Sequence, residues 1–321
     1  MVAHLVIALA AGGASGAMFA SIVSGSLISL LLLYLSALPL MVAALGWGPL
    51  WAAMGGVAAA IGLATAFGAS EGIAYAVAVA LPACWLGHLC LLGRAVAYTD
   101  RGARDADAHL EWYPVGRILP WIAGFAALAA GAALLTLGTD AATINNALRG
   151  FLQRSFVLNK AATSPEIEHW IDTMVHLAPA AAAIATTATL TLNLWLAAKV
   201  TATSGRLQRP WPDLRAAALP VMTLAALCVA IAFCFSGGLL AMLANIVTAA
   251  LLMAYVLTGF AVLHTLTLAL KSRVFWLGST YAAVMMLGWP MLAMAALGLA
   301  DAIFGLRQCY LRSRSPPLAA P

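Results

Sequence analysis

The stretch that decides the fold runs from Ser26 to Leu45 and reads SLISLLLLYLSALPLMVAAL, with no charged residue in it. A helix that crosses a bilayer needs about 20 mostly apolar residues, and this stretch is long enough. It lies within residues 1–93, which contain no Lys or Arg and a single acidic residue, Glu71. We therefore expect membrane-spanning helices, beginning near the N-terminus.

The composition of the whole chain supports the same expectation. Of its 321 residues, 64% are hydrophobic and 8% are charged, whereas about 25% of the residues of a soluble domain are charged. A soluble fold would lack the polar side chains to cover its surface, but lipid solvates the outside of a helical bundle in a membrane. The lipid bilayer is therefore the first expected partner.

Apolar stretches of spanning length recur along the sequence. They predict an all-α fold, a polytopic transmembrane helix bundle of eight to nine spans, with eight if one stretch is re-entrant or interfacial. We expect a single domain over residues 1–310 and a disordered tail over 311–321. The candidate spans are 3–22, 26–45, 48–68, 72–93, 118–138, 173–198, 216–236, 239–270 and 275–305.

Basic residues indicate the orientation of these spans. The stretches 94–117 and 199–215 hold eight of the sixteen Lys and Arg residues, and cytoplasmic loops carry an excess of such residues. We therefore expect a multi-pass protein of the bacterial inner membrane, with these stretches and the N-terminus in the cytoplasm and Glu71 and the loop 139–172 outside. Nine spans would place Arg307 outside the cytoplasm, against this preference of basic residues, so a total of eight spans remains an alternative.

The loop 139–172 is predicted to contain a helix lying along the membrane surface. Its apolar residues recur at helical spacing, a pattern typical of interfacial helices. Thr163-Ser164-Pro165-Glu166 then resembles a capping box, which predicts a second helix continuing into the span near 173. The apolar positions of the first helix are Ile144, Leu148, Phe151, Leu152 and Phe156.

The candidate substrate-binding residues are Glu71, His169, Asp172, His176 and Asn245. His169, Asp172 and His176 share one helix face by spacing, and imidazoles beside a carboxylate could bind a divalent metal ion or relay a proton. An acidic helix start at the lipid headgroups explains the same pattern without any ligand. Asn245 is expected near the outer end of its span, where it could face the same cavity as Glu71 and Asp172.

Other polar residues inside the spans are expected to fix helix packing. An intramembrane polar side chain is a functional candidate by default, but an interhelical hydrogen bond is the commoner explanation. These residues are His88, Asn193, His264 and Asp301.

Two stripes of small residues also predict close helix packing within the monomer. The stripes are Gly12, Gly16 and Ala20, and, more weakly, Gly55, Ala59 and Leu63.

Several classes of function lack their sequence patterns. There is no P-loop, and no GxSxG or HExxH pattern appears at a plausible place, so we expect no enzyme, no catalytic residue and no ATP site. The five cysteines form no CxxC pair, and we expect no metal and no cofactor. The basic residues cap membrane segments instead of forming a stripe, which excludes nucleic acid as an expected partner.

Several short motifs follow one another along the chain: Leu38-Pro39-Leu40 to Gly46-Trp47-Gly48, Glu111-Trp112-Tyr113-Pro114-Val115-Gly116, Asn193-Leu194-Trp195-Leu196, Ser204-Gly205-Arg206-Leu207, Arg209-Pro210-Trp211-Pro212, and Gly298-Leu299-Ala300-Asp301 with Arg307. Taken in order, these motifs resemble a bacterial membrane family named only as a domain of unknown function, DUF2232 (YybS-like). The resemblance implies a multi-span inner-membrane protein, distantly similar to the substrate-binding subunits of energy-coupling-factor transporters, which dock onto a separate ATPase. The chain departs from those subunits in its extra spans and its long 139–172 loop.

Two functions of different classes remain open. In the first, the chain is a transporter-like small-molecule binding subunit that lacks its own ATPase and needs an energising subunit or an ion gradient. In the second, it is a membrane scaffold that binds other proteins through basic cytoplasmic residues such as Arg101, Arg104, Arg206 and Arg209. A lipid-modifying enzyme would depend on the His169, Asp172 and His176 face alone.

Overall fold

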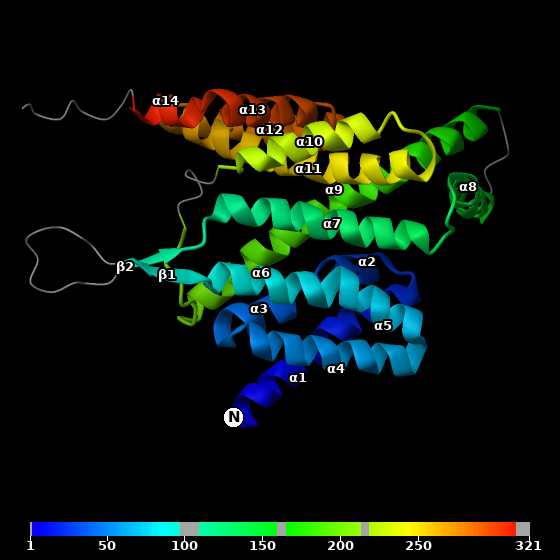
Figure 1. Ribbon diagram of the computed structural model, residues 1–321, viewed down its shortest axis with the longest axis horizontal. Coiled ribbons are helices and arrows are strands. Elements are labelled where there is room, and N and C mark those ends of the chain that lie inside the picture. The colour runs from blue at the N-terminus through cyan, green and yellow to red at the C-terminus, as the bar shows by residue number, and fades with distance from the viewer. Residues whose placement is uncertain (1, 97–108, 159–164, 213–217, 313–321) are drawn as a thin grey trace, which may run out of the picture.

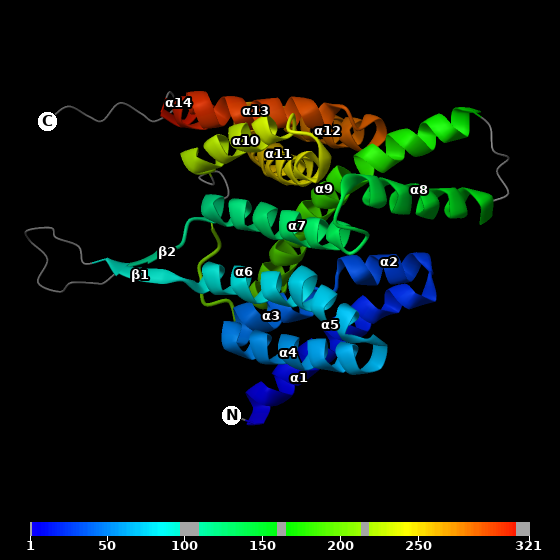
Figure 2. The ribbon, with the colours of Figure 1, turned by 45° about the vertical axis from the view of Figure 1, so that its right-hand side comes forward.

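The computed structural model describes residues 2–96, 109–158, 165–212 and 218–312, and it is an all-α bundle with one small β-ribbon (Figures 1 and 2). Seven of its helical segments are long and apolar enough to cross a membrane. These segments are Val2–Ser24, Leu27–Trp47, Pro49–Phe67, Ala69–Leu91, Val115–Leu135, Glu166–Thr203 and Gly238–Leu266.

Most of the helices run nearly parallel along one axis. The order is α1 (Val2–Ala20), α2 (Leu27–Tyr34), α3 (Leu38–Trp47), α4 (Pro49–Phe67), α5 (Ala69–Tyr75), α6 (Leu81–Leu91), α7 (Ile118–Leu135), α8 (Ala141–Leu158), α9 (Pro165–Thr203), α10 (Val221–Phe233), α11 (Gly238–Leu266), α12 (Arg273–Leu287), α13 (Pro290–Phe304) and α14 (Leu306–Arg312). Figure 1 shows α1–α6 as one half and α10–α14 as the other, with α7 between them and α9 crossing obliquely through both.

The two small-residue stripes pack against each other, which confirms the predicted close helix packing within the monomer and identifies its partners. A Cβ atom added to Gly12 of α1 would lie 2.1 Å from the carbonyl oxygen of Gly55 of α4, and one added to Gly16 would lie 3.3 Å from Cβ of Ala59. Nothing larger than hydrogen fits at Gly12, so the two backbones touch directly. This contact lies within the monomer and holds the N-terminal half together.

Buried polar residues form hydrogen bonds within the N-terminal half and between that half and α9. Tyr75 Oη donates to Ser15 Oγ at 2.8 Å, and Ser15 Oγ donates to the carbonyl of Ser36 at 2.6 Å. Asn193 Nδ2 donates to the carbonyl of Tyr34 at 2.7 Å, next to the break between α2 and α3. The packing interpretation of Asn193 is thus confirmed, because its amide group partners a carbonyl at a helix end.

The predicted span 275–305 is wrong, because two helices occupy it. Gly288 has φ +70° and ends α12, and Pro290 begins α13. Figures 1 and 2 both show α13 returning along the bundle, so that α14 lies at the end that carries the β-ribbon. At that end Arg307 forms a buried ion pair with Asp301, with Nη2 and Oδ2 2.6 Å apart.

The remaining C-terminal helices differ from the predicted spans mainly in length. The span expected at 216–236 is a shorter helix of 13 residues, α10, which follows Pro220. The long apolar stretch at 239–270 is helix α11, whose 29 residues end at Leu266. His264 Nε2 lies 2.9 Å from Tyr281 Oη, so this histidine links α11 to α12.

The segment 94–117, which was predicted to be a loop, contains the ribbon. Strands β1 (Gly93–Val96) and β2 (His109–Trp112) pair antiparallel, with Gly93 opposite Trp112. Arg94 and Glu111 form an exposed ion pair at 2.6 Å across the ribbon. Alternating apolar residues are too few here for the pattern to be recognised in the sequence.

The predicted surface helix and the helix after it are both present. α8 is seen end-on in Figure 1, so it lies across the direction of the bundle helices at the end opposite the ribbon. The side chain of Ile144, a residue of α8 itself, is fully buried. α9 starts at Pro165, as the sequence predicted, and continues for 39 residues without interruption; the capping residues Thr163 and Ser164 lie outside the described residues.

Candidate functional site

Two of the five candidate residues meet at one cavity. His176 of α9 and Asn245 of α11 both line a space of about 280 Å³ beneath α8. Asn145 of α8 and Pro179 of α9 also line it. Three helices thus bring two amides and one imidazole together, and we call this space the α8 cavity.

The α8 cavity has hydrogen-bonding capacity that the described residues do not use. The buried Oδ1 atom of Asn145 has no hydrogen-bond partner among them. Buried acceptors without a donor are costly in a protein interior, so this site is suited to a ligand that donates hydrogen bonds.

The other three candidates are not among the described residues that line this cavity. Asp172 forms an ion pair with Arg149 of α8, and both side chains are about half exposed. His169 is exposed near the start of α9, and Glu71 is exposed in the first turn of α5. Asp172 therefore has a partner that docks α8 onto α9.

Asn145 was missed in the sequence. It follows Ile144, the first residue of the apolar stripe, so it lies at the edge of the face that α8 turns toward the bundle. An amide at the edge of an apolar stripe is the signal that could have identified it. Among the described residues no cluster of three potential metal ligands exists.

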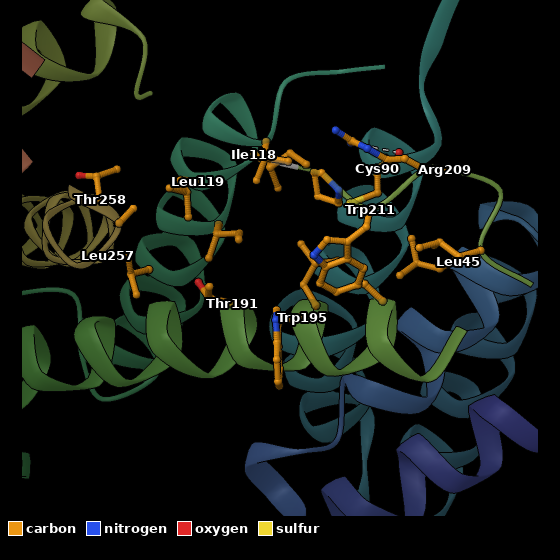
Figure 3. Close-up of a pocket in the computed structure, with 17 residues that line it drawn as sticks. Leu45, Cys90, Ile118, Leu119, Thr191, Trp195, Arg209, Trp211, Leu257 and Thr258 are labelled. Atoms are coloured by element: carbon orange, nitrogen blue, oxygen red, sulfur yellow. Dashed lines mark hydrogen bonds between the residues drawn. The ribbon is translucent and has the colours of Figure 1, made fainter. Parts of the chain in front are cut away.

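A second cavity, of about 260 Å³, lies between the two halves of the bundle at the ribbon end. Figure 3 shows Ile118 and Leu119 of α7 and Thr191 and Trp195 of α9 facing it. Trp211 enters from the segment after α9. We call this space the inter-half cavity.

The inter-half cavity has an apolar wall and a basic rim. The hydroxyls of Thr191 and Thr258 donate to carbonyls of their own helices, those of Thr187 and Tyr255, at 2.8 and 2.9 Å. Arg209 is the one charged residue among the described residues that line the cavity.

Arg209 lines the cavity itself, and two further basic residues lie beside lining residues, Lys199 next to the ring of Trp211 and Arg206 next to Leu207 in the sequence. Arg209 Nη1 donates a long hydrogen bond of 3.4 Å to the carbonyl of Cys90, and burial lowers the pKa of the Arg209 guanidinium below its usual value without removing its charge at neutral pH. Lys199 Nζ lies 4.2 Å from the ring centroid of Trp211. Arg206 lies over the ring of Trp47, at 4.8 Å.

Comparison of the chain with protein-family models, with curated proteins and with solved structures found no match. The resemblance to DUF2232 therefore stays a prediction.

Proposed function

We propose that the chain is a transporter-like membrane protein that binds a small polar molecule in the α8 cavity. The convergence of His176, Asn245 and Asn145 from three helices on one space supports this proposal. The side chains of Asn and His offer both hydrogen-bond donors and acceptors, which suits a small solute with hydroxyl, amide or amino groups. A volume of about 280 Å³ is just below the range of about 300–1,000 Å³ for drug-sized ligands.

The proposed orientation places the α8 cavity at the outer face of a bacterial inner membrane. The basic residues Lys199, Arg206 and Arg209 lie at the opposite end, and basic residues favour the cytoplasmic side. The N-terminus of α1 and helix α14 would then both be cytoplasmic. If α10, α12 and α13 also cross the membrane, they and the seven long apolar helices of the described residues make ten spans, more than the expected eight or nine. An even number of spans leaves both ends of the chain on one side.

Movement of a solute across the membrane would need a source of energy outside this sequence. The sequence contains no P-loop, so a separate energising subunit or an ion gradient would have to drive it. The resemblance to DUF2232, and through it to transporter binding subunits, agrees with this division of labour. It does not identify the solute, because a fold does not fix a function.

The test is ligand-dependent stabilisation of the purified protein in detergent. We expect at least one compound in a panel of vitamins, amino acids and sugars to raise the midpoint of thermal unfolding. At one hundred times its dissociation constant, a ligand stabilises the folded state by about 2.7 kcal/mol. Asn145→Leu should abolish the shift, because it removes the unpartnered acceptor.

Asn146→Leu is the matched control, since Asn146 is the next residue on α8 and is exposed. It should leave the ligand shift unchanged. A panel that gives no shift with the unaltered protein, or equal loss in both variants, would count against binding in the α8 cavity.

The scaffold function receives less support from the described residues. Arg101 and Arg104 lie outside them. Arg206 lies over Trp47, and Arg209 is half-buried against the end of α6. Arg209 is therefore engaged by the bundle, whereas Arg206 stays exposed over the Trp47 ring.

A further inference from the structure

The inter-half cavity combines an apolar interior with a cluster of positive charge at one end. Leu194, Ile122 and Leu257 come from three different helices and give it a wall without free hydrogen-bonding groups. Such a wall cannot recognise the polar solute proposed for the α8 cavity, because each polar group brought into it would lose its hydrogen bonds to water. The two cavities therefore suit different ligands.

Among the residues that the structure describes, the basic rim has no acidic counterpart. Lys199, Arg206 and Arg209 form no ion pair with a carboxylate in the part of the chain that the structure describes, where Arg94, Arg149 and Arg307 do. Three cations within one short stretch repel one another. An anion bound between them would relieve this repulsion, and its attraction would be strengthened by the low dielectric of the neighbouring apolar wall.

The cavity also reaches the outside of the bundle. Trp195 and Trp211 line it, yet they remain 44% and 42% exposed. Tryptophan is enriched where a membrane meets water, and basic pockets between membrane helices on the cytoplasmic side bind acidic lipid headgroups. A volume of about 260 Å³ has room for part of one acyl chain, and the rest of such a lipid would stay in the bilayer.

We propose that the inter-half cavity binds an anionic phospholipid, with its phosphate between Arg209 and Lys199 and the start of one acyl chain against Ile122 and Leu257. Arg206, over Trp47, adds to the positive field from the side of α3. The lipid would fill the space between the two halves of the bundle and join them across α9. This site is independent of the proposed function, because its lining residues and its ligand are different.

The experiment uses the full chain in a neutral detergent. Dioctanoyl phosphatidylglycerol and dioctanoyl phosphatidylcholine are titrated separately, and the midpoint of thermal unfolding is followed. We expect the anionic lipid to stabilise the protein at a concentration about tenfold lower than the zwitterionic lipid. The difference should shrink in 1 M salt, where the Debye length falls to about 3 Å.

Variants assign this preference to the rim. In the double variant Arg209→Gln with Lys199→Gln, the stabilisation by phosphatidylglycerol should fall to that given by phosphatidylcholine. The double variant Arg209→Lys with Lys199→Arg should keep most of the preference for the anionic lipid. Lys271→Gln, at an exposed basic residue outside the cavity, is the control and should change nothing. Equal response to both lipids in the unaltered protein would overturn the proposal, even if the double variant failed to fold.

A further arm separates the lipid from its headgroup. Glycerol phosphate carries the charge without the chains, and we expect it to stabilise the protein far less than phosphatidylglycerol. Ala261→Phe should fill the apolar wall and weaken the response to the lipid, while Ala202→Phe, exposed near the end of α9, should not. If glycerol phosphate stabilised the protein as strongly as the lipid, the apolar cavity would have no part in binding and the proposal would fail.

Discussion

Single glycines set how closely the helices approach in both halves of the bundle. In the C-terminal half, a Cβ atom added to Gly298 of α13 would lie 2.1 Å from the carbonyl oxygen of Tyr255 of α11. One added to Gly259 would lie 1.9 Å from the carbonyl oxygen of Met294. These contacts repeat the Gly12 and Gly55 contact of the other half, so each half is fastened by backbone contact at glycine. In a bilayer, apolar side chains gain little free energy by moving from lipid into a helix interface. Van der Waals contact between closely packed backbones therefore drives helix association.

Gly298→Ala tests this contact. The added methyl group meets backbone, which cannot move away as a side-chain end would, so α11 and α13 must separate. We expect a loss of about 1–3 kcal/mol in the free energy of unfolding, the usual cost of overpacking, measured from thermal or denaturant unfolding in detergent. Gly278→Ala on α12 is the control, because a Cβ atom there has nothing within 4 Å. Equal stability of the two variants would contradict the argument.

The sequence identified several such residues without their partners. Gly12 and Asn193 were recognisable as packing residues from their types and spacing. The partner of Asn193, the carbonyl of Tyr34, is 159 residues away in the chain. That distance explains why pattern alone could not find it, since helical periodicity indicates which face is buried and not what covers it. The same limit applies to His176 and Asn245, which were expected at one cavity together with Asp172, although Asp172 pairs with Arg149 instead.

Among the elements, α8 depends on a carboxylate at its start. The backbone N–H of Thr143 donates to Asp140 Oδ1 at 2.9 Å, and Thr143 Oγ1 donates to Asp140 Oδ2 at 2.6 Å. These hydrogen bonds, the side-chain one first, hold the pKa of Asp140 below its usual value. The cap stabilises the first turn of α8 above the ordinary pKa of an aspartate, and this contribution is lost as the pH falls through the lowered value.

Amide hydrogen exchange at Thr143 measures this cap. Asp140→Ala should speed exchange in the first turn of α8 at neutral pH, and it should remove the further loss of protection, relative to the intrinsic exchange rate, that the unaltered protein shows as the pH falls below about 4. Asp140→Asn keeps one acceptor oxygen but cannot titrate, so its exchange should show intermediate protection. The interpretation would be wrong if protection at Thr143 were the same in all three proteins.

Among the elements, the sequence prediction was least accurate for the C-terminal apolar run. Residues 275–305 are hydrophobic on average, and average hydropathy does not distinguish one long tilted helix from two short helices. The local signal was present, because Gly288-Trp289-Pro290 places a helix-ending glycine just before a proline at the first helical position. Glycine and proline also marked other turns, as at Gly237-Gly238. Those turns were identified correctly because the helices on either side form separate apolar runs in the sequence.

In the whole molecule, the two cavities lie at opposite ends of the same two helices. His176 and Trp195 of α9 are 19 residues apart, which is about 28 Å along a helix. The hydrocarbon core of a bilayer is about 30 Å thick. The α8 cavity and the inter-half cavity would therefore open near the two faces of the core. α9 and α11 connect the cavities, so a change at one end could reach the other through these helices.

The last prediction concerns which ends of the bundle share a side of the membrane. Because the break at Gly288 returns α13 to the ribbon end, a topology reporter fused after Tyr310 should report the same side as one fused after Gln208, and a reporter after Gly150 of α8 should report the opposite side. A phosphatase that is active only outside the cytoplasm, paired with a fluorescent protein that folds only inside it, gives both readouts for each fusion. We expect phosphatase activity after Gly150 and fluorescence after the other two, since Lys199, Arg206 and Arg209 favour the cytoplasm. If the reporters after Tyr310 and Gln208 fell on opposite sides, α12 and α13 would not form a returning pair in the membrane; if all three were reversed, the pairing would stand but the α8 cavity would face inward.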